Sequence, residues 1–314
     1  MVRGLEVDSH VPVLLDEVLR GLAVRADGVY VDGTFGRGGH SGAILATLGA
    51  GGRLMALDRD PDAVAAGRSL QTADQRFSIE QERFGQLRRI VQTAGVQGSV
   101  DGILLDLGVS SPQLDSAERG FSFQFDGPLD MRMDPGSTPS AAEWLNSADE
   151  HDIRVVLQRL GEEPDARQIA RSICERRSRQ PLQTTADLVA AVREAVRRPP
   201  TGRHPATRVF QAVRIFINRE LEEIEAGLAQ SLEALRAGGR LCVISFHSLE
   251  DRIVKRFMRD HSRVDPALAS LPVVPPGAAP KVRLIGGAIH AGEAELARNP
   301  RARSAVLRVA ERLA

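Results

Sequence analysis

The chain has 314 residues, of which 42% are hydrophobic and 26% charged, as is typical of a globular protein with one large or two moderate domains. Basic and acidic side chains number 41 each, and this balance argues against non-specific coating of nucleic acid, although a local basic face is compatible with it. No apolar run reaches the roughly 20 residues of a membrane span, and the N-terminal segment lacks a signal-peptide layout. The two cysteines, Cys174 and Cys242, are too few for a disulfide framework or a cysteine zinc site. We therefore expect a cytoplasmic protein with no metal and no membrane partner.

The first hundred residues alternate between strand and helix signals. The apolar runs "GVYVD" (28–32), "RLMALD" (53–58) and "GILLD" (102–106) predict buried strands. Segments with apolar residues at helical spacing lie between them, one of which is opened by Pro61. This order predicts an α/β fold with a parallel, helix-covered sheet and ligands at the carboxyl ends of its strands.

The alternation ends after "SSPQLD" (110–115). Residues 116–140 are rich in Gly, Pro, Asp and aromatic side chains without a sustained period, which predicts a long irregular segment of the kind that is usually functional. From 141 to 198 the signals are helical, and Thr184 with Asp187 forms the pattern of a helix cap. This region is therefore predicted to be mostly helical.

One helix of about thirty residues is predicted from Ala206 to Arg236 by its apolar spacing. Strand signals return in "RLCVISF" (240–246) and "VLRVAE" (306–311). We therefore expect a discontinuous sheet domain, residues 1–115 plus 211–314, interrupted by a helical substrate-recognition domain, residues 116–210.

The segment "GTFGRGGHS" (33–41) lies between the first predicted strand and the following helix. Gly36-x-Gly38 begins a dinucleotide fingerprint, but Ser41 stands where its third glycine belongs, and the Gly-Lys-Ser/Thr of a P-loop is missing. The glycines alone are compatible with a tight structural turn as well as with a ligand loop. The absent third glycine counts against an NAD-linked oxidoreductase.

Three aspartates, Asp32, Asp58 and Asp106, end predicted strands. An acidic residue at the position of Asp58 suits the two hydroxyls of a ribose. A crevice with this much negative charge suits a pyrophosphate badly and a cationic ligand well. S-Adenosylmethionine carries a ribose, an ammonium and a sulfonium but no phosphate, so we expect it to be the cofactor.

Long blocks of the sequence are similar to one enzyme family. "DGTFGRGGHS", "DGILLDLGVSSPQLD", "GPLDMRMD" and "SFHSLEDRIVKRF" resemble the bacterial ribosomal RNA small-subunit methyltransferase H family, also called MraW. The resemblance spans nearly the whole chain and is weakest around residues 264–290. It implies a class I, Rossmann-like S-adenosylmethionine-dependent methyltransferase with an inserted helical domain. The implied substrate is the N4 amine of a decoding-centre (P-site) cytidine in 16S rRNA of the small ribosomal subunit. The cofactor contacts that it implies are Gly38, Gly39, His40, Asp58, Phe84, Asp106 and Gln113.

Methyl transfer to N4 is an in-line displacement that needs no metal, but the nitrogen lone pair is delocalised into the cytosine ring. Acceptors for the amine hydrogens would localise it. Related enzymes use Asp/Asn-Pro-Pro-aromatic, whereas this chain has "DLGVSSPQ" (106–113), so Asp106, Ser110 and Ser111 are candidates. His247 follows a predicted strand and is a further candidate. A purely structural role for "SFHSLED" is as plausible, with Ser248 and Asp251 as a helix capping box.

The target base must leave its stack, and Phe121, Phe123, Phe125 and Arg132 of the irregular segment are candidates to receive it. Alternatively, these phenylalanines pin the segment to the core. Residues 151–220 contain 14 arginines against eight acidic residues, Arg208 and Arg214 among them, which favours a phosphate-contacting face or a solvated helix surface.

The same fold serves methylation of an amino group of another RNA or DNA base, and the sequence does not separate free rRNA from the assembled subunit as substrate. A homodimer is compatible with it as well.

Overall fold

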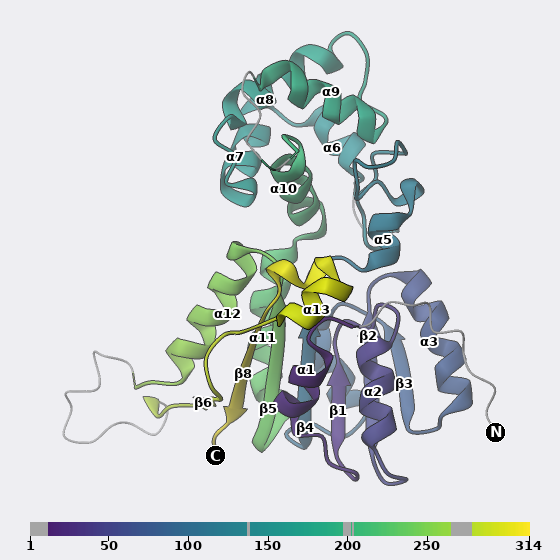
Figure 1. Cartoon of the computed structure of the whole chain (residues 1–314), viewed down its shortest axis with the longest axis vertical. Helices are drawn as coiled ribbons and strands as arrows, with labels where there is room; N and C mark the ends of the chain where they lie inside the picture. The colour runs from purple at the N-terminus through teal and green to yellow at the C-terminus, as the bar shows by residue number, and fades with distance from the viewer. Residues whose placement is uncertain (1–11, 137–138, 197–201, 203, 265–277) are drawn as a thin grey trace. The chain divides into compact units, whose positions relative to one another are not determined.

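The computed structural model describes residues 12–136, 139–196, 202, 204–264 and 278–314 (Figure 1). The chain divides into two compact units, a sheet unit (Met1–Gly108 with Leu221–Ala314) and a helical unit (Val109–Glu220). The limits 116–210 expected for the insertion fall inside the helical unit. No helix among the described residues is long and apolar enough to cross a membrane. Residues 265–277, within the stretch 264–290 where the resemblance is weakest, lie outside the described residues.

The described residues of the sheet unit form eight strands in the order β3-β2-β1-β4-β5-β8-β6, with β7 beside β8. Strands β1 to β5 pair in parallel, and β8 runs antiparallel to β5, β6 and β7. The predicted α/β class with a mostly parallel sheet is confirmed. The strands are β1 (Val29–Asp32), β2 (Arg53–Asp58), β3 (Phe77–Gln81), β4 (Val100–Asp106), β5 (Leu235–Ser245), β6 (Val282–Leu284), β7 (Ile289–His290) and β8 (Val306–Arg312).

Helices cover both faces of this sheet. Successive strand residues point to opposite faces, and apolar residues on each face pack against helices. Leu54 and Leu104 belong to the core cluster that includes α1 (Leu15–Leu22), α2 (Gly39–Thr47) and α3 (Pro61–Ala73). Their neighbours Met55 and Leu105 belong to the cluster on the other face, with α4 (Leu87–Thr93), α11 (Glu220–Ala234) and α12 (Ser248–His261). The short elements η1 (Phe84–Gln86), α13 (Glu293–Arg298) and η4 (Pro300–Ser304) complete the unit.

The helical unit has a core of its own, in which Ile153, Ile169 and Val213 are fully buried. Thr184 caps α9 together with Asp187, as predicted. The described elements are α5 (Ser111–Asp115), η2 (Ala117–Arg119), α6 (Ala141–Ser147), α7 (Glu150–Gly161), α8 (Ala166–Arg177), α9 (Thr185–Ala195) and α10 (Thr207–Asn218).

The single long helix predicted from Ala206 to Arg236 is wrong. Two helices, α10 and α11, occupy most of this stretch, and its last two residues begin β5. The break lies at Arg219, whose φ of 49° is left-handed and ends α10. The apolar spacing continues across the break, so periodicity could not reveal it.

Candidate functional site

Three aspartates meet at one edge of the sheet. Asp32, Asp58 and Asp106 end β1, β2 and β4, and β1 pairs in parallel with both other strands. Because carboxyl ends of parallel strands meet at the same edge, the three side chains are brought together there as predicted. Burial raises the pKa of both Asp58 and Asp106, and the nearby negative charge of Asp32 adds to the effect at each. We call these three residues the carboxylate edge.

Asp32 is the internal member of the carboxylate edge. Only 1% of its surface is exposed, and its Oδ2 accepts a hydrogen bond of 2.7 Å from the Ser41 hydroxyl. Its Oδ1 accepts one of 3.1 Å from the Thr34 backbone N–H. Asp32 therefore stabilises the loop between β1 and α2, and Asp58 and Asp106 are the members of the carboxylate edge suited to contact a ligand.

Asp58 holds the same loop from the second strand. Its Oδ2 accepts a hydrogen bond of 2.8 Å from Gly36 N–H, and its Oδ1 accepts one of 2.9 Å from Asp60 N–H. Burial raises the pKa of Asp58 to about 6, so its ionised form lacks sufficient stabilisation in the protein alone. Each carboxylate oxygen can accept a second hydrogen bond, and the two hydroxyls of a ribose would supply them.

Asp106 carries an unsatisfied oxygen. Its backbone N–H donates to the Thr34 hydroxyl at 2.7 Å, and its Oδ2 lies 3.7 Å from His40 Nδ1. Its Oδ1 is buried and has no hydrogen-bond partner among the described residues. Burial raises the pKa of Asp106 to about 6, and nearby Asp32 and Glu250 add to this effect while His40 opposes it. A buried oxygen without a partner is uncommon and suits a donor from a ligand.

The glycines of the segment 33–41 pack closely against neighbouring side chains. Gly38 has a φ of 75°, and a Cβ there would lie 2.6 Å from the Phe35 ring. A Cβ at Gly39 would overlap the ring of Pro12. His40 follows in the first turn of α2, and its Nε2 contacts the Val13 carbonyl at 3.0 Å. Packing explains both glycines, and the engaged imidazole leaves the backbone as the part of His40 best suited to meet a cofactor.

The other two predicted cofactor contacts lie in different units. Phe84 begins η1 and is partly buried, and a Cβ at Gly33 would lie 3.0 Å from its Cβ, so it flanks the loop after β1. Gln113 lies in α5 of the helical unit and is 6% exposed. Its Oε1 accepts a hydrogen bond of 3.0 Å from Ser110 N–H, which caps α5. Ser111 is the first residue of that helix.

His247 caps α12, so the predicted capping box of Ser248 and Asp251 is wrong. Its Nδ1 accepts from Glu250 N–H at 3.4 Å, and Asp251 instead pairs with Arg308 of β8 at 2.6 Å. His247 Nε2 also lies 3.1 Å from Glu250 Oε1, at an angle that makes no hydrogen bond. The fully buried Glu250, which influences Asp106, was missed. Its place three residues after His247 matches the third position of a capping box and could have revealed it.

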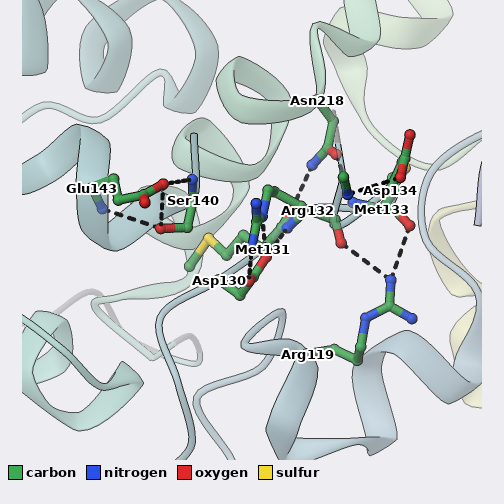
Figure 2. Close-up of polar contacts among 10 residues, drawn as sticks. Arg119, Asp130, Met131, Arg132, Met133, Asp134, Ser140, Glu143 and Asn218 are labelled. Atoms are coloured by element: carbon green, nitrogen blue, oxygen red, sulfur yellow. Dashed lines mark hydrogen bonds and ion pairs between the residues drawn. The ribbon is translucent and has the colours of Figure 1, made fainter. Parts of the chain in front are cut away.

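Arg132 is presented by a tightly held turn in the helical unit (Figure 2). Met131 is fully buried with a left-handed φ of 61°. Asn218 accepts a hydrogen bond of 2.8 Å from Met133 N–H and donates one of 2.7 Å to the Met131 carbonyl. The Arg119 side chain donates to the carbonyls of Arg132 and Met133. The Arg132 side chain pairs with Asp130 through Nε and Nη2, at 2.9 and 2.7 Å.

The aromatic candidates have different environments. Phe121 is 5% exposed and belongs to the core of the helical unit, as the structural alternative expected. Phe123 stacks on His204 with ring centroids 4.5 Å apart and meets Phe210 edge-on. Phe125 is 56% exposed. Of these rings, the exposed one is therefore best placed to stack on a base.

The two arginine candidates of α10 also differ. Arg208 is exposed. The side chain of Arg214 is 14% exposed and binds both carboxylate oxygens of Glu220, at 2.9 and 2.8 Å. Arg208 is the better placed of the two to meet a phosphate.

Comparisons with known proteins identify the family. The chain matches the MraW methylase family over residues 8–313. It is 57% identical to the ribosomal RNA small subunit methyltransferase H of Thiobacillus denitrificans over 309 residues, 98% of each chain. It is 56% identical to the protein of that name from Thioalkalivibrio sulfidiphilus, over 99% of each chain, and 53% identical to that from Coxiella burnetii, over 98% of this chain and 100% of the relative. The predicted resemblance is thus confirmed: the chain belongs to the MraW methylase family, and S-adenosylmethionine is its cofactor.

Proposed function

We propose that this protein transfers the methyl group of S-adenosylmethionine to the N4 amine of a P-site cytidine in the 16S rRNA of the small ribosomal subunit. The carboxylate edge carries the proposal. In a chain of a methylase family, two buried carboxylates with raised pKa values suit a cationic, hydroxyl-bearing methyl donor and an acceptor that bears an amine. The names of the relatives support rRNA of the small subunit as substrate. The N4 position follows from the motif resemblance.

When bound, S-adenosylmethionine supplies a methyl group activated by its sulfonium. The backbone of the loop after β1 would hold the methionine end, while Asp58 accepts the ribose hydroxyls and Phe84 forms an apolar wall for the adenine. Gln113 is a contact implied by the resemblance. The proposed cofactor contacts are Gly38, Gly39, His40, Asp58, Phe84, Asp106 and Gln113.

Asp106 is the acceptor best prepared for the amine hydrogens, since its Oδ1 has no hydrogen-bond partner among the described residues. A hydrogen bond from N4 to this carboxylate would localise the nitrogen lone pair and stabilise the positive charge that develops on nitrogen. Ser110, Ser111 and His247 are further candidates, although Ser110 and His247 have capping roles of their own. Phe125 and Arg208 are the proposed RNA contacts that the structure leaves exposed, and Arg132, whose guanidinium pairs with Asp130, is a further candidate.

The test is methylation of small subunits from a bacterial strain that lacks its own copy of this enzyme. The purified protein and labelled S-adenosylmethionine are incubated with these subunits, with free 16S rRNA and with DNA, and the product is mapped by mass spectrometry. We expect one N4-methylcytidine in 16S rRNA. Label that enters only DNA, another RNA base, or a carbon of cytosine would contradict the proposal.

A further inference from the structure

Both ring nitrogens of His40 face oxygen atoms of the sheet unit. Nε2 lies 3.0 Å from the Val13 carbonyl, which can only accept, so Nε2 carries a proton. In a neutral imidazole, Nδ1 then carries a lone pair and no proton. This atom lies 3.7 Å from Asp106 Oδ2. Without a further proton, two acceptors face each other. One proton on either group turns this contact into an attractive one.

The surroundings make Asp106 dependent on His40. The charged neighbours that act on Asp106 are Asp32 and Glu250, both acidic, and His40. The Thr34 hydroxyl accepts from the Asp106 backbone and the Ser41 hydroxyl donates to Asp32, so neither satisfies the Asp106 side chain. In the described parts of the chain, Asp106 Oδ1 has no hydrogen-bond partner at all. His40 is therefore the group positioned to share a proton with this carboxylate.

We propose that Asp106 and His40 act as one proton acceptor for the amine that receives the methyl group, an inference that rests on the proposed function. The sulfur–methyl bond breaks with its electron pair left on sulfur, and the nitrogen lone pair forms the new nitrogen–methyl bond. One N–H proton passes to Asp106, and its Oδ2 and His40 Nδ1, which lie 3.7 Å apart before the reaction, approach to hydrogen-bond distance to share it. Asp106 is the catalytic residue, because it touches the amine. His40 is a positioning residue, held in place by Val13.

Charge changes during the reaction favour this transfer. A bound sulfonium would stabilise the ionised form of Asp106 before the reaction, and this stabilisation would be lost when the methyl transfer removes the positive charge from sulfur. The carboxylate then holds a proton more readily, at the moment when the methylated nitrogen must lose one. Because the pair is buried, these electrostatic effects are stronger than they would be in water.

The test compares wild type with His40→Gln in single-turnover methylation of small subunits at saturating S-adenosylmethionine over a pH series. Glutamine can donate to the Val13 carbonyl and offer an amide to Asp106, but it cannot take up a proton. We expect cofactor affinity, measured by calorimetry, to stay within about threefold and the rate to fall about 100-fold, in the range of acid–base contributions. Since His40 lowers the pKa of Asp106, the acidic limb of the rate profile should move to higher pH in the variant.

The matched control is His261→Gln in α12, because the His261 ring also contacts a backbone carbonyl, that of Phe257 at 2.9 Å. It should retain the wild-type rate and profile. A His40→Gln protein with the wild-type rate and profile would overturn the inference alone. The inference would also be overturned if His40→Gln lost both cofactor affinity and methylation rate while the pH profile of the rate stayed unshifted. That result would show that His40 has a structural role. Wild-type methylation of a carbon or oxygen atom would overturn the proposed function and the inference with it.

Discussion

Asp58 offers the most direct test of the cofactor contact at the scale of one residue. We expect Asp58→Asn to weaken S-adenosylmethionine binding about 10- to 100-fold, because hydrogen bonds to a charged group contribute about 1.5–3 kcal/mol. Calorimetry measures the change. Asp62→Asn is the matched control, since Asp62 is an exposed carboxylate in the first turn of α3. Equal affinities of Asp58→Asn and wild type would refute the ribose contact.

The raised pKa values of Asp58 and Asp106 predict a pH dependence of cofactor binding. Both are about 6, and a cationic ligand with hydroxyl donors requires the ionised forms. Affinity should therefore fall by about tenfold per carboxylate between about pH 7 and about pH 5. The folding stability of the cofactor-free protein should change with pH in the opposite direction. It should rise as the pH falls, because burial penalises the ionised carboxylates and protonation relieves that cost. Calorimetry at several pH values tests this prediction, and Asp58→Asn should remove part of the dependence.

The residues of the carboxylate edge could be predicted from the sequence because each ends an apolar strand. Their separate roles could not, since those depend on donors from other parts of the chain. Ser41 and Thr34 commit Asp32 to the interior, whereas Asp106 Oδ1 receives no such donor from the described residues. His40 likewise looks like a loop residue until Val13 and Asp106 are placed around its ring.

At the scale of elements, strands and most helices follow from local periodicity, whereas the junction of α10 and α11 depends on tertiary contacts. Asn218 is 2% exposed and bonds to Met131 and Met133, which lie more than eighty residues earlier in the chain. The next residue, Arg219, takes a left-handed conformation that ends α10. An apolar pattern cannot report a break that is held by an amide side chain and a distant turn.

This junction predicts two opposite changes in stability. Asn218→Ala should destabilise the helical unit by about 2–4 kcal/mol, because buried backbone groups of Met131 and Met133 lose their partner. Arg219→Gly should instead stabilise it by up to about 1 kcal/mol, because glycine adopts a positive φ without strain. Urea unfolding followed by fluorescence measures both, since Trp144 in α6 is the only tryptophan of the chain. Destabilisation by Arg219→Gly would contradict this account of the break.

At the scale of the whole molecule, the division into two units changes the interpretation of the arginine excess in residues 151–220. Residues 151–220 have an excess of six arginines over acidic residues, but the helical unit also contains residues 109–150, with eight acidic residues and two arginines. The unit as a whole is therefore neutral. RNA binding by this unit would have to depend on where individual arginines are exposed, and its net charge would contribute little.

Arg208 and Arg214 separate these two possibilities. Arg208 is exposed, whereas Arg214 is committed to Glu220. We expect Arg208→Gln to weaken binding of small-subunit rRNA and to reduce the slope of log affinity against log salt by about one, as one lost phosphate contact predicts. Arg171→Gln removes another exposed charge, from α8, where Arg171 pairs with Glu175, and should change the slope less. Equal effects of the two variants on the slope would mean that overall charge attracts the RNA, and the assignment of Arg208 as a specific contact would then be wrong.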